Sequence, residues 1–202
     1  MKSNHSPPLR GLVLAGGRSQ RMGTDKAALR HPDGRTLARR SYDLLVEAGC
    51  ETVMVSLRHE QDLPPGFDDL AAISVARDPE GPSQGPLGGM IAAMRMHPEA
   101  AWLVLACDLP RLDSASLRNL ISSIRPDEAF LSYRSEFDGL PEPLCTLYAA
   151  GCLAVLQQAQ ADGIRCPRKV LIRHQCRLLE AATPRALENA NTPEDWQLAT
   201  TP

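Results

Sequence analysis

Short apolar runs alternate along this chain with amphipathic stretches, and this alternation predicts strands and helices in turn. The run Trp102-Leu103-Val104-Leu105-Ala106 is nearly all apolar, as expected for a parallel strand buried on both faces. Leu37, Leu45 and Ala48 give an earlier stretch one apolar helical face. The order of the segments predicts a mostly parallel sheet flanked by helices. The expected strands are 11–15, 52–56, 73–76, 102–106, 128–132 and 143–148, and the expected helices are 36–49, 86–97, 114–124, 149–161 and 193–199.

Stretches dense in proline and glycine interrupt this pattern, among them 135–143. The strand expected at 143–148 is entered through Pro141 and Pro143. Because proline has no N–H to donate, we expect this strand to lie at an edge of the sheet or to begin late. The segment 161–169 is expected to link the preceding helix to a more basic C-terminal part.

Length and composition limit the possible functions. A chain of 202 residues suits one α/β domain, and we expect a short disordered lead-in over 1–9 and a single domain over 10–202. Hydrophobic residues make up 43% of the chain, enough for a sizeable core, and because aromatic residues are only 4%, aliphatic packing dominates it. A net charge of −2 gives no reason to expect nucleic-acid binding.

Targeting signals and metal motifs are absent from the sequence itself. No apolar run approaches the length needed to span a bilayer, and the start of the chain lacks the apolar segment of a signal peptide. The 6 cysteines form no C-x-x-C pair, and the 5 histidines are dispersed, so we assign none of them a metal. We therefore expect a cytoplasmic protein with reduced core cysteines and no membrane partner.

The first candidate for chemistry is the end of the first expected strand. The strand ends in Leu14-Ala15-Gly16-Gly17, and a loop containing Arg18 and Arg21 leads to Lys26. Glycine lets the backbone approach a ligand closely, and clustered N–H groups and cationic side chains bind phosphate. The glycines at 16, 17 and 23 match neither the Rossmann fingerprint nor the P-loop. The alternative is an ordinary strand-to-loop turn with solvated arginines.

The second candidate is Asp108, which directly follows the buried strand at 102–106 in the string Cys107-Asp108-Leu109-Pro110. Ligands of open α/β sheets bind at the carboxyl ends of the strands. A single carboxylate, together with phosphate oxygens and waters, is a usual way of holding Mg²⁺. The alternative is an aspartate that caps a helix or a turn.

The string Gly85-Pro86-Leu87-Gly88-Gly89 opens the helix expected at 86–97. Its small residues would let a base or ribose lie against the backbone, and helix N-termini bind anions. It can equally be a helix start initiated by proline. Asp78 just before this loop could accept hydrogen bonds from the N1–H and exocyclic amine of guanine, or belong to a plain turn.

Three further features come later in the chain. Thr192-Pro193-Glu194-Asp195 has the pattern of a helix N-terminus, which leaves Asn189 and Asn191 unexplained; they could bind a polar heterocycle or steady a metal site. Glu142 could face a cleft or be solvated. A basic group that could receive an anionic acceptor, or be a solvated face, consists of Arg165, Arg168, Lys169 and Arg173.

Taken together, the motifs resemble those of the molybdenum cofactor guanylyltransferase family, the molybdopterin-directed nucleotidyltransferases. The strings that carry the resemblance are L-A-G-G…R-M-G-x-D-K at 14–26, G-P-L-G-G at 85–89, C-D-L-P at 107–110 and N-x-N-T-P-E-D at 189–195. They occur in the family's order and extend over almost the whole chain. The resemblance implies a Rossmann-like three-layer nucleotidyltransferase domain.

The resemblance also implies a reaction, in which GMP passes from GTP to molybdopterin-bound molybdenum with release of pyrophosphate. It implies Mg²⁺ as the cofactor, and GTP, molybdopterin or molybdenum cofactor, and molybdoenzyme chaperones as partners. Carried over by position, the implied catalytic residues are Lys26, Asp108 and Arg21, with Asp108 holding the metal. The implied nucleotide-binding residues are Leu14, Ala15, Gly16, Gly17, Lys26, Ser56, Asp78, Gly85, Pro86, Leu87, Gly88 and Asp108, and the acceptor-binding residues are Glu142, Asn189, Asn191, Arg168 and Lys169.

Two departures and two rivals remain open. Ser56 stands where the family often has asparagine, and the string Pro141-Glu142-Pro143-Leu144 differs from that of some members. One rival is a nucleotidyltransferase that uses CTP, or that acts on a sugar 1-phosphate. The other is a non-catalytic carrier of nucleotide or molybdopterin, which would not need both Lys26 and Asp108.

Overall fold

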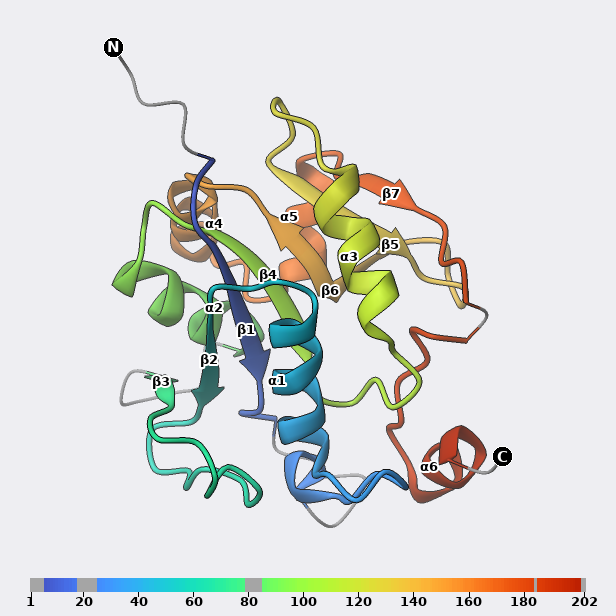
Figure 1. Ribbon diagram of the computed structural model, residues 1–202. Coiled ribbons are helices and arrows are strands. Elements are labelled where there is room, and N and C mark those ends of the chain that lie inside the picture. The colour runs from blue at the N-terminus through green and yellow to red at the C-terminus, as the bar shows by residue number, and fades with distance from the viewer. Residues whose placement is uncertain (1–5, 18–24, 79–84, 184, 201–202) are drawn as a thin grey trace.

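The computed structural model describes residues 6–17, 25–78, 85–183 and 185–200. In this part of the chain, seven strands form one sheet in the order β3-β2-β1-β4-β6-β5-β7 (Figure 1). The strands are β1 (Leu9–Leu14), β2 (Thr52–Leu57), β3 (Ser74–Arg77), β4 (Ala101–Ala106), β5 (Phe130–Arg134), β6 (Pro141–Tyr148) and β7 (Arg177–Leu179). All neighbouring strands are parallel except β6, which is antiparallel to both β4 and β5. The predicted mostly parallel sheet is therefore confirmed.

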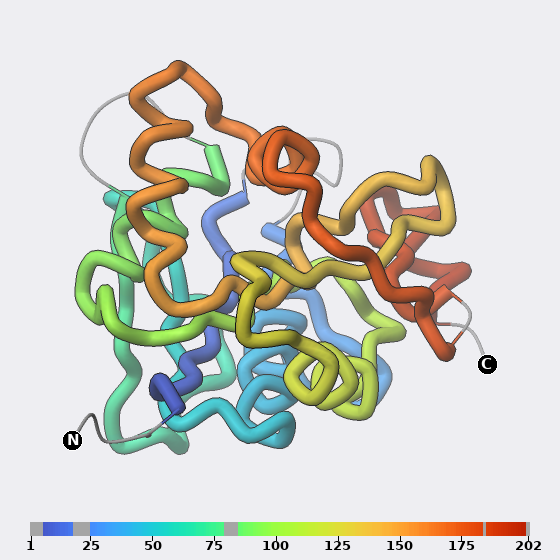
Figure 2. The backbone as a smooth tube through the Cα atoms, turned by 90° about the horizontal axis from the view of Figure 1, so that it is seen from above, coloured from blue at the N-terminus to red at the C-terminus, as the bar shows by residue number. Residues whose placement is uncertain are grey.

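Helices cover both faces of the sheet, so the domain has three layers. The helices are α1 (Leu37–Glu47), α2 (Gly85–Met96), α3 (Ser114–Ser123), α4 (Cys152–Ala161), α5 (Pro167–Arg173) and α6 (Pro193–Thr200), with a short 3-10 turn, η1 (Lys26–Ala28). Figure 2 shows α1 and α3 on one side of the sheet and α4 and α5 on the other. Each face has its own apolar core, because successive strand residues point to opposite faces. Val13, for example, packs under α1, and Leu12 packs on the α2 side.

Two short elements, α5 and β7, were not predicted from the sequence. The segment expected to be a link, 161–169, instead runs into the start of α5, a helix that buries only Pro167, Val170 and Leu171. β7 has three half-buried residues and pairs only with β5. Elements this short do not fill the window of residues that a periodic pattern needs. Packing on β6 stabilises α5, and pairing with β5 stabilises β7.

The position of β6 differs from its prediction. The strand begins at Pro141 and lies inside the sheet, between β4 and β5, although its two prolines predicted an edge or a late start. The pairing of β6 with β4 begins only at Cys145, opposite Leu105. Pro141 and Pro143 precede that point, so the missing N–H groups cost no bond to β4. The proline pattern was correct for the β4 pairing and wrong for the strand as a whole.

Other element boundaries differ by a few residues. β1 begins at Leu9, which pairs with Ala101, so the predicted lead-in includes the first residue of a strand. α4 begins at Cys152 rather than 149, because Gly151 just before it has a φ of +86°. Four cysteines lie in the core as predicted, but Cys166 is exposed. Within the described residues, every helix is too short or too polar to cross a bilayer.

Candidate functional site

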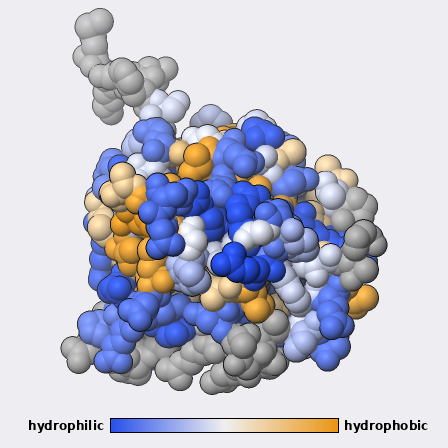
Figure 3. All heavy atoms as spheres, turned by 60° about the horizontal axis from the view of Figure 1, so that its bottom comes forward, coloured by the Kyte–Doolittle hydropathy of each residue, from blue (hydrophilic) through white to orange (hydrophobic). Residues whose placement is uncertain are grey.

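A cavity of about 620 Å³ opens at the edge of the sheet where β1, β2 and β4 end. This edge lies at the bottom of Figure 1 and is turned toward the viewer in Figure 3, where hydrophilic residues gather at the centre of the face. Parallel strands bring their carboxyl ends together, which is where ligands of such sheets bind. The cavity is lined by Leu14, Ala15, Gly16, Gly17, Asp25, Lys26, Ala27, Ser56, Arg58, Asp78, Gly85, Pro86, Gly89, Ala106, Cys107, Asp108, Leu144 and Asn191.

The exit of β1 forms one wall of the cavity. The ladder between β1 and β2 continues to Ala15, whose N–H donates to the Ser56 carbonyl at 3.0 Å. A Cβ at Gly16 would lie 3.4 Å from the backbone nitrogen of Arg58, so the two segments pass close to each other. Gly16 and Gly17 line the cavity and carry no side chain, so their backbone can approach a ligand closely.

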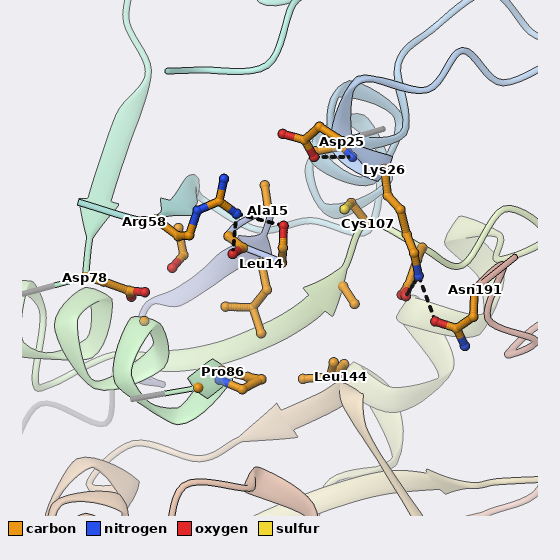
Figure 4. A pocket seen from close by; sticks show the side chains of 18 residues that line it. Leu14, Ala15, Asp25, Lys26, Arg58, Asp78, Pro86, Cys107, Leu144 and Asn191 are labelled. Carbon is orange, nitrogen blue, oxygen red and sulfur yellow. Dashed lines mark hydrogen bonds and ion pairs between the residues drawn. The ribbon is translucent and has the colours of Figure 1, made fainter. Parts of the chain in front are cut away.

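Lys26 and Asp108 meet on a second wall. Asn191, from near the C-terminus, points toward the Lys26 ammonium (Figure 4). The Lys26 ammonium donates to Asp108 Oδ2 at 3.1 Å and to Asn191 Oδ1 at 2.7 Å. Both members of the ion pair are largely buried, with side-chain exposures of 14% and 19%. Asp108 Oδ1 is also buried and accepts no hydrogen bond from any described residue. The sequence therefore predicted three residues that the fold brings into direct contact.

Asn191 is positioned by two backbone features around it. The N–H of Ala190 donates to the Asp108 carbonyl at 3.0 Å, which ties the C-terminal segment to the end of β4. Thr192 and Asp195 cap α6 reciprocally: the Asp195 N–H donates to Thr192 Oγ1 and the Thr192 N–H donates to Asp195 Oδ2. This confirms the predicted helix start. Asn189 lies near this segment without lining the cavity.

A third corner of the cavity lies between β2, β3 and α2. Gly89 of α2 faces this corner, where a Cβ would clash with Ser56 Oγ and lie 3.1 Å from Asp78 Oδ1. Burial raises the pKa of Asp78, and the nearby positive charge of Arg58 partly offsets this. The corner therefore presents a carboxylate and a hydroxyl beside bare helix backbone, a combination suited to a flat polar heterocycle.

The start of α2 completes that corner. Gly85 has a φ of +66°, and a Cβ there would lie 3.1 Å from the Arg165 carbonyl, so a side chain is disfavoured on two grounds. Pro86 follows and lines the cavity, which supports the predicted helix start. Leu87 and Gly88 are placed differently from their prediction: both are buried in the helix, and Leu87 packs into the core. Gly89 faces the cavity instead.

Of the predicted acceptor residues, Asn191 lines the cavity, whereas Glu142 at the start of β6 and the basic residues of α5 lie beyond the lining. Glu142 was predicted either to face a cleft or to be solvated. It is only 5% exposed, so it is buried and neither prediction is correct. Arg168 of α5 lies 3.6 Å from it and forms a 2.6 Å ion pair with Asp138. Burial raises the pKa of Glu142 to about 7, against the lowering effect of Arg168. Lys169 is exposed on the same helix.

Some lining residues were not singled out from the sequence. Arg58 was missed although it directly follows a buried parallel strand, the same signal that identified Asp108. Leu144 gave no signal, because only the interior position of β6 brings it to the cavity. Asp25 was noticed only as part of a motif. Arg21, predicted to take part in catalysis, lies outside the described residues.

The chain is similar to known proteins over most of its length. The MobA-like NTP transferase domain family matches residues 11–190. A molybdenum cofactor biosynthesis bifunctional protein from Synechocystis sp. is 36% identical over 189 residues, which are 94% of this chain and 53% of that protein. The chain thus spans about half the length of this relative. A molybdenum cofactor guanylyltransferase from Pseudomonas putida is 31% identical over 192 residues, or 95% of this chain and 97% of that one.

Solved structures show the same fold. The molybdopterin-guanine dinucleotide biosynthesis protein A from Archaeoglobus fulgidus is 22% identical, with a TM-score of 0.72. The match covers 95% of this chain and 96% of that one. Together with the layered sheet described above, it confirms the predicted three-layer α/β class.

Proposed function

Because the chain belongs to the MobA-like NTP transferase domain family and is a nucleotidyltransferase, we propose that it transfers GMP from GTP to the molybdenum cofactor. In this proposal, residues 10–202 form a single nucleotidyltransferase domain. A cytoplasmic location stays a prediction. The observation that carries the proposed transfer is the contact between Lys26 and Asp108 beside the glycine-rich exit of β1. A cation, a carboxylate and open backbone in one cavity are the groups that a nucleoside triphosphate with a metal ion requires.

The nucleotide would span the cavity from the β1 exit to α2. Its phosphates would lie against the backbone of Gly16 and Gly17 and against Lys26. Its guanine would lie between Asp78 and α2, with the carboxylate accepting from the N1–H and the exocyclic amine. Other cavity-lining residues that would contact the nucleotide in this proposal are Leu14, Ala15, Ser56, Gly85 and Pro86.

Mg²⁺ fits the residues present. Asp108 Oδ1 is buried, accepts no hydrogen bond within the described part of the chain, and is an oxygen of the hard type that Mg²⁺ prefers. When bound there, the ion would offset negative charge on the phosphates during transfer. Lys26 keeps the second carboxylate oxygen oriented, and Asn191 orients Lys26 in turn.

The transfer itself needs alignment more than acid–base chemistry. An oxygen of the acceptor phosphate forms a bond to the α-phosphorus as the bond to the bridging oxygen of the β-phosphate breaks, and pyrophosphate leaves. A phosphate monoester has a second pKa of about 6, so the attacking group is already anionic near neutral pH. The chain holds the two partners in line, and Lys26 neutralises charge on the leaving pyrophosphate.

The acceptor would bind on the side of β6 and α5. Arg168 and Lys169 supply positive charge there, and Glu142 supplies a carboxyl group that could hydrogen-bond a heterocycle. Asn191, which accepts a hydrogen bond from Lys26, and Asn189 would be further acceptor-binding residues in this proposal. Molybdoenzyme chaperones are further proposed partners.

The test is pyrophosphate release with Mg²⁺ and purified molybdenum cofactor, comparing GTP with CTP, ATP and UTP. Reactions without acceptor, and reactions with Asp108→Ala, serve as controls. Release with GTP alone supports the proposal. Release with CTP alone would overturn the guanine assignment and keep the reaction class. If the protein binds GTP but none of the four nucleotides yields pyrophosphate, the proposed transfer is refuted. The protein is then a carrier, or its acceptor is a sugar 1-phosphate.

A further inference from the structure

Two side chains from the connection after β2 hold the backbone that leaves β1. Arg58 Nη1 donates to the carbonyls of Gly16 and Gly17, each at 2.8 Å. Gln61 Nε2 donates to the carbonyl of Ala15 at 3.0 Å. All three carbonyls of the β1 exit therefore have side-chain donors that come from outside the loop itself. Figure 4 shows Arg58 reaching this backbone.

Gln61 also reaches the segment that contains Lys26. Its Nε2 donates to Asp25 Oδ2 at 3.2 Å. The other oxygen of Asp25 accepts from the Ala27 N–H at 3.0 Å and so caps the turn η1 in which Lys26 lies. One amide side chain thus connects the β1 exit to the lysine segment.

The connection is itself held rigid by β3. Arg77 at the end of β3 donates to the carbonyls of Arg58, His59 and Gln61 at 3.2, 3.0 and 2.7 Å. The N–H of Arg58 donates to Gln61 Oε1 at 3.2 Å, and the N–H of Gln61 to the Arg58 carbonyl at 3.2 Å. The two donors therefore start from a fixed turn, which lowers the entropy lost when they bind the loop.

The direction of these bonds matters for a polyanion. In a planar trans peptide, the carbonyl and the following N–H point in opposite directions. Drawing the Gly16 carbonyl toward Arg58 therefore turns the N–H of Gly17 the other way. Carbonyl oxygens left facing the cavity would repel phosphate, whereas N–H groups attract it. The guanidinium also adds a positive charge at the cavity wall.

We propose that Arg58 and Gln61 form a clamp that presets the phosphate-binding backbone and the position of Lys26 before nucleotide arrives. They are positioning residues, because they act through Gly16, Gly17 and Asp25. The clamp rests on the proposed nucleotide binding. Its two residues lie outside the sequence motifs and would support the residues that those motifs contain. Without the clamp, the nucleotide itself would have to order this backbone, and the entropy lost on ordering would weaken nucleotide binding.

The variants Arg58→Ala, Gln61→Ala and the double variant test this, with Arg95→Ala as a control from the exposed last turn of α2. We expect the KM for GTP to rise about tenfold in each single variant, the size expected for loss of one hydrogen bond to a charged group. The KM for the acceptor should not change. Because both residues hold one unit, the double variant should be little worse than either single variant. Arg58→Lys keeps the charge and should recover part of the loss.

Amide hydrogen exchange supplies a readout that does not need nucleotide. In Arg58→Ala and Gln61→Ala, the amides of Ala15 and Ala27, which donate to the Ser56 carbonyl and to Asp25 Oδ1, should exchange faster, with the melting temperature close to that of Arg95→Ala. Unchanged exchange overturns the clamp even if the protein binds no GTP. If Arg58→Ala alone weakens binding and Gln61→Ala does nothing, Arg58 contacts the nucleotide directly, and the clamp is likewise refuted. Failure of the wild type to bind GTP, with faster exchange in the variants, would refute the proposed function and leave the clamp as a property of the loop.

Discussion

The buried carboxyl of Glu142 should make the stability of this protein depend on pH in a measurable way. Burial raises its pKa from 4.5 to about 7; Arg168 and the Leu144 N–H oppose this, and the charges of Asp108 and Asp138 add to it. At about 1.4 kcal/mol for each pKa unit, the difference corresponds to about 3 kcal/mol. The residue Glu142 is only 5% exposed, so solvent screening removes little of this effect.

The sign follows from proton binding. Between about pH 4.5 and 7, the folded protein binds a proton at Glu142 that the unfolded chain has already released. The free energy of unfolding therefore falls as pH rises through this window. The contribution is full below the unfolded pKa of 4.5 and is lost by the time pH has passed the folded pKa of about 7.

Urea unfolding of the wild type and of Glu142→Gln at several values between pH 5 and 8 measures this directly. The variant cannot ionise at this position, so its free energy of unfolding relative to that of the wild type should rise with pH by about 2 to 3 kcal/mol. Glu180→Gln is the matched control, because Glu180 is a largely exposed partner of Arg134. A difference between wild type and Glu142→Gln that stays constant across this range would refute the reasoning.

Three further substitutions probe the cavity itself. Asp108→Asn keeps the shape but removes the charge that would hold Mg²⁺, so pyrophosphate release should be nearly abolished with an unchanged circular dichroism spectrum; near-normal turnover would remove the metal assignment. Lys26→Ala should lower kcat/KM about 100-fold, as for one preorganised donor, and an equal rate would place Lys26 outside the chemistry. Gly89→Ala puts a Cβ against Ser56 Oγ and 3.1 Å from Asp78 Oδ1, so calorimetry should show GTP binding weakened about tenfold. Unaltered affinity there would mean that the base binds elsewhere.

The parts of the site that could be predicted are those encoded next to one another in the chain. The glycines at the β1 exit, and Asp108 after β4, follow strands whose apolar sequences are unmistakable. The cap formed by Thr192 and Asp195 is likewise local, because its donor and acceptor are three residues apart. In each case, the backbone conformation depends on the residues themselves more than on distant packing.

The parts that could not be predicted depend on contacts between distant segments. Lys26 and Asn191 are 165 positions apart in the sequence and yet share a 2.7 Å hydrogen bond. Leu144 reaches the cavity, and Glu142 becomes buried, only because β6 enters the sheet beside β4 and α5 covers it. The role of Arg58 depends on the β2–β3 connection folding back over β1. No local pattern in the sequence predicts these contacts between distant residues.

The sequence by itself determined the class of fold, the strand ends that carry the chemistry and the family, because strands, turns and caps respond to neighbouring residues. The tertiary structure decided which side chains meet. Lys26 pairs with Asp108 and Asn191, Gly89 rather than Leu87 faces the cavity, and Glu142 is buried. The physical reason is that burial and pairing are properties of the packed chain. They arise only when the strand order brings the carboxyl ends of β1, β2 and β4 to one edge and closes the C-terminal segment over it.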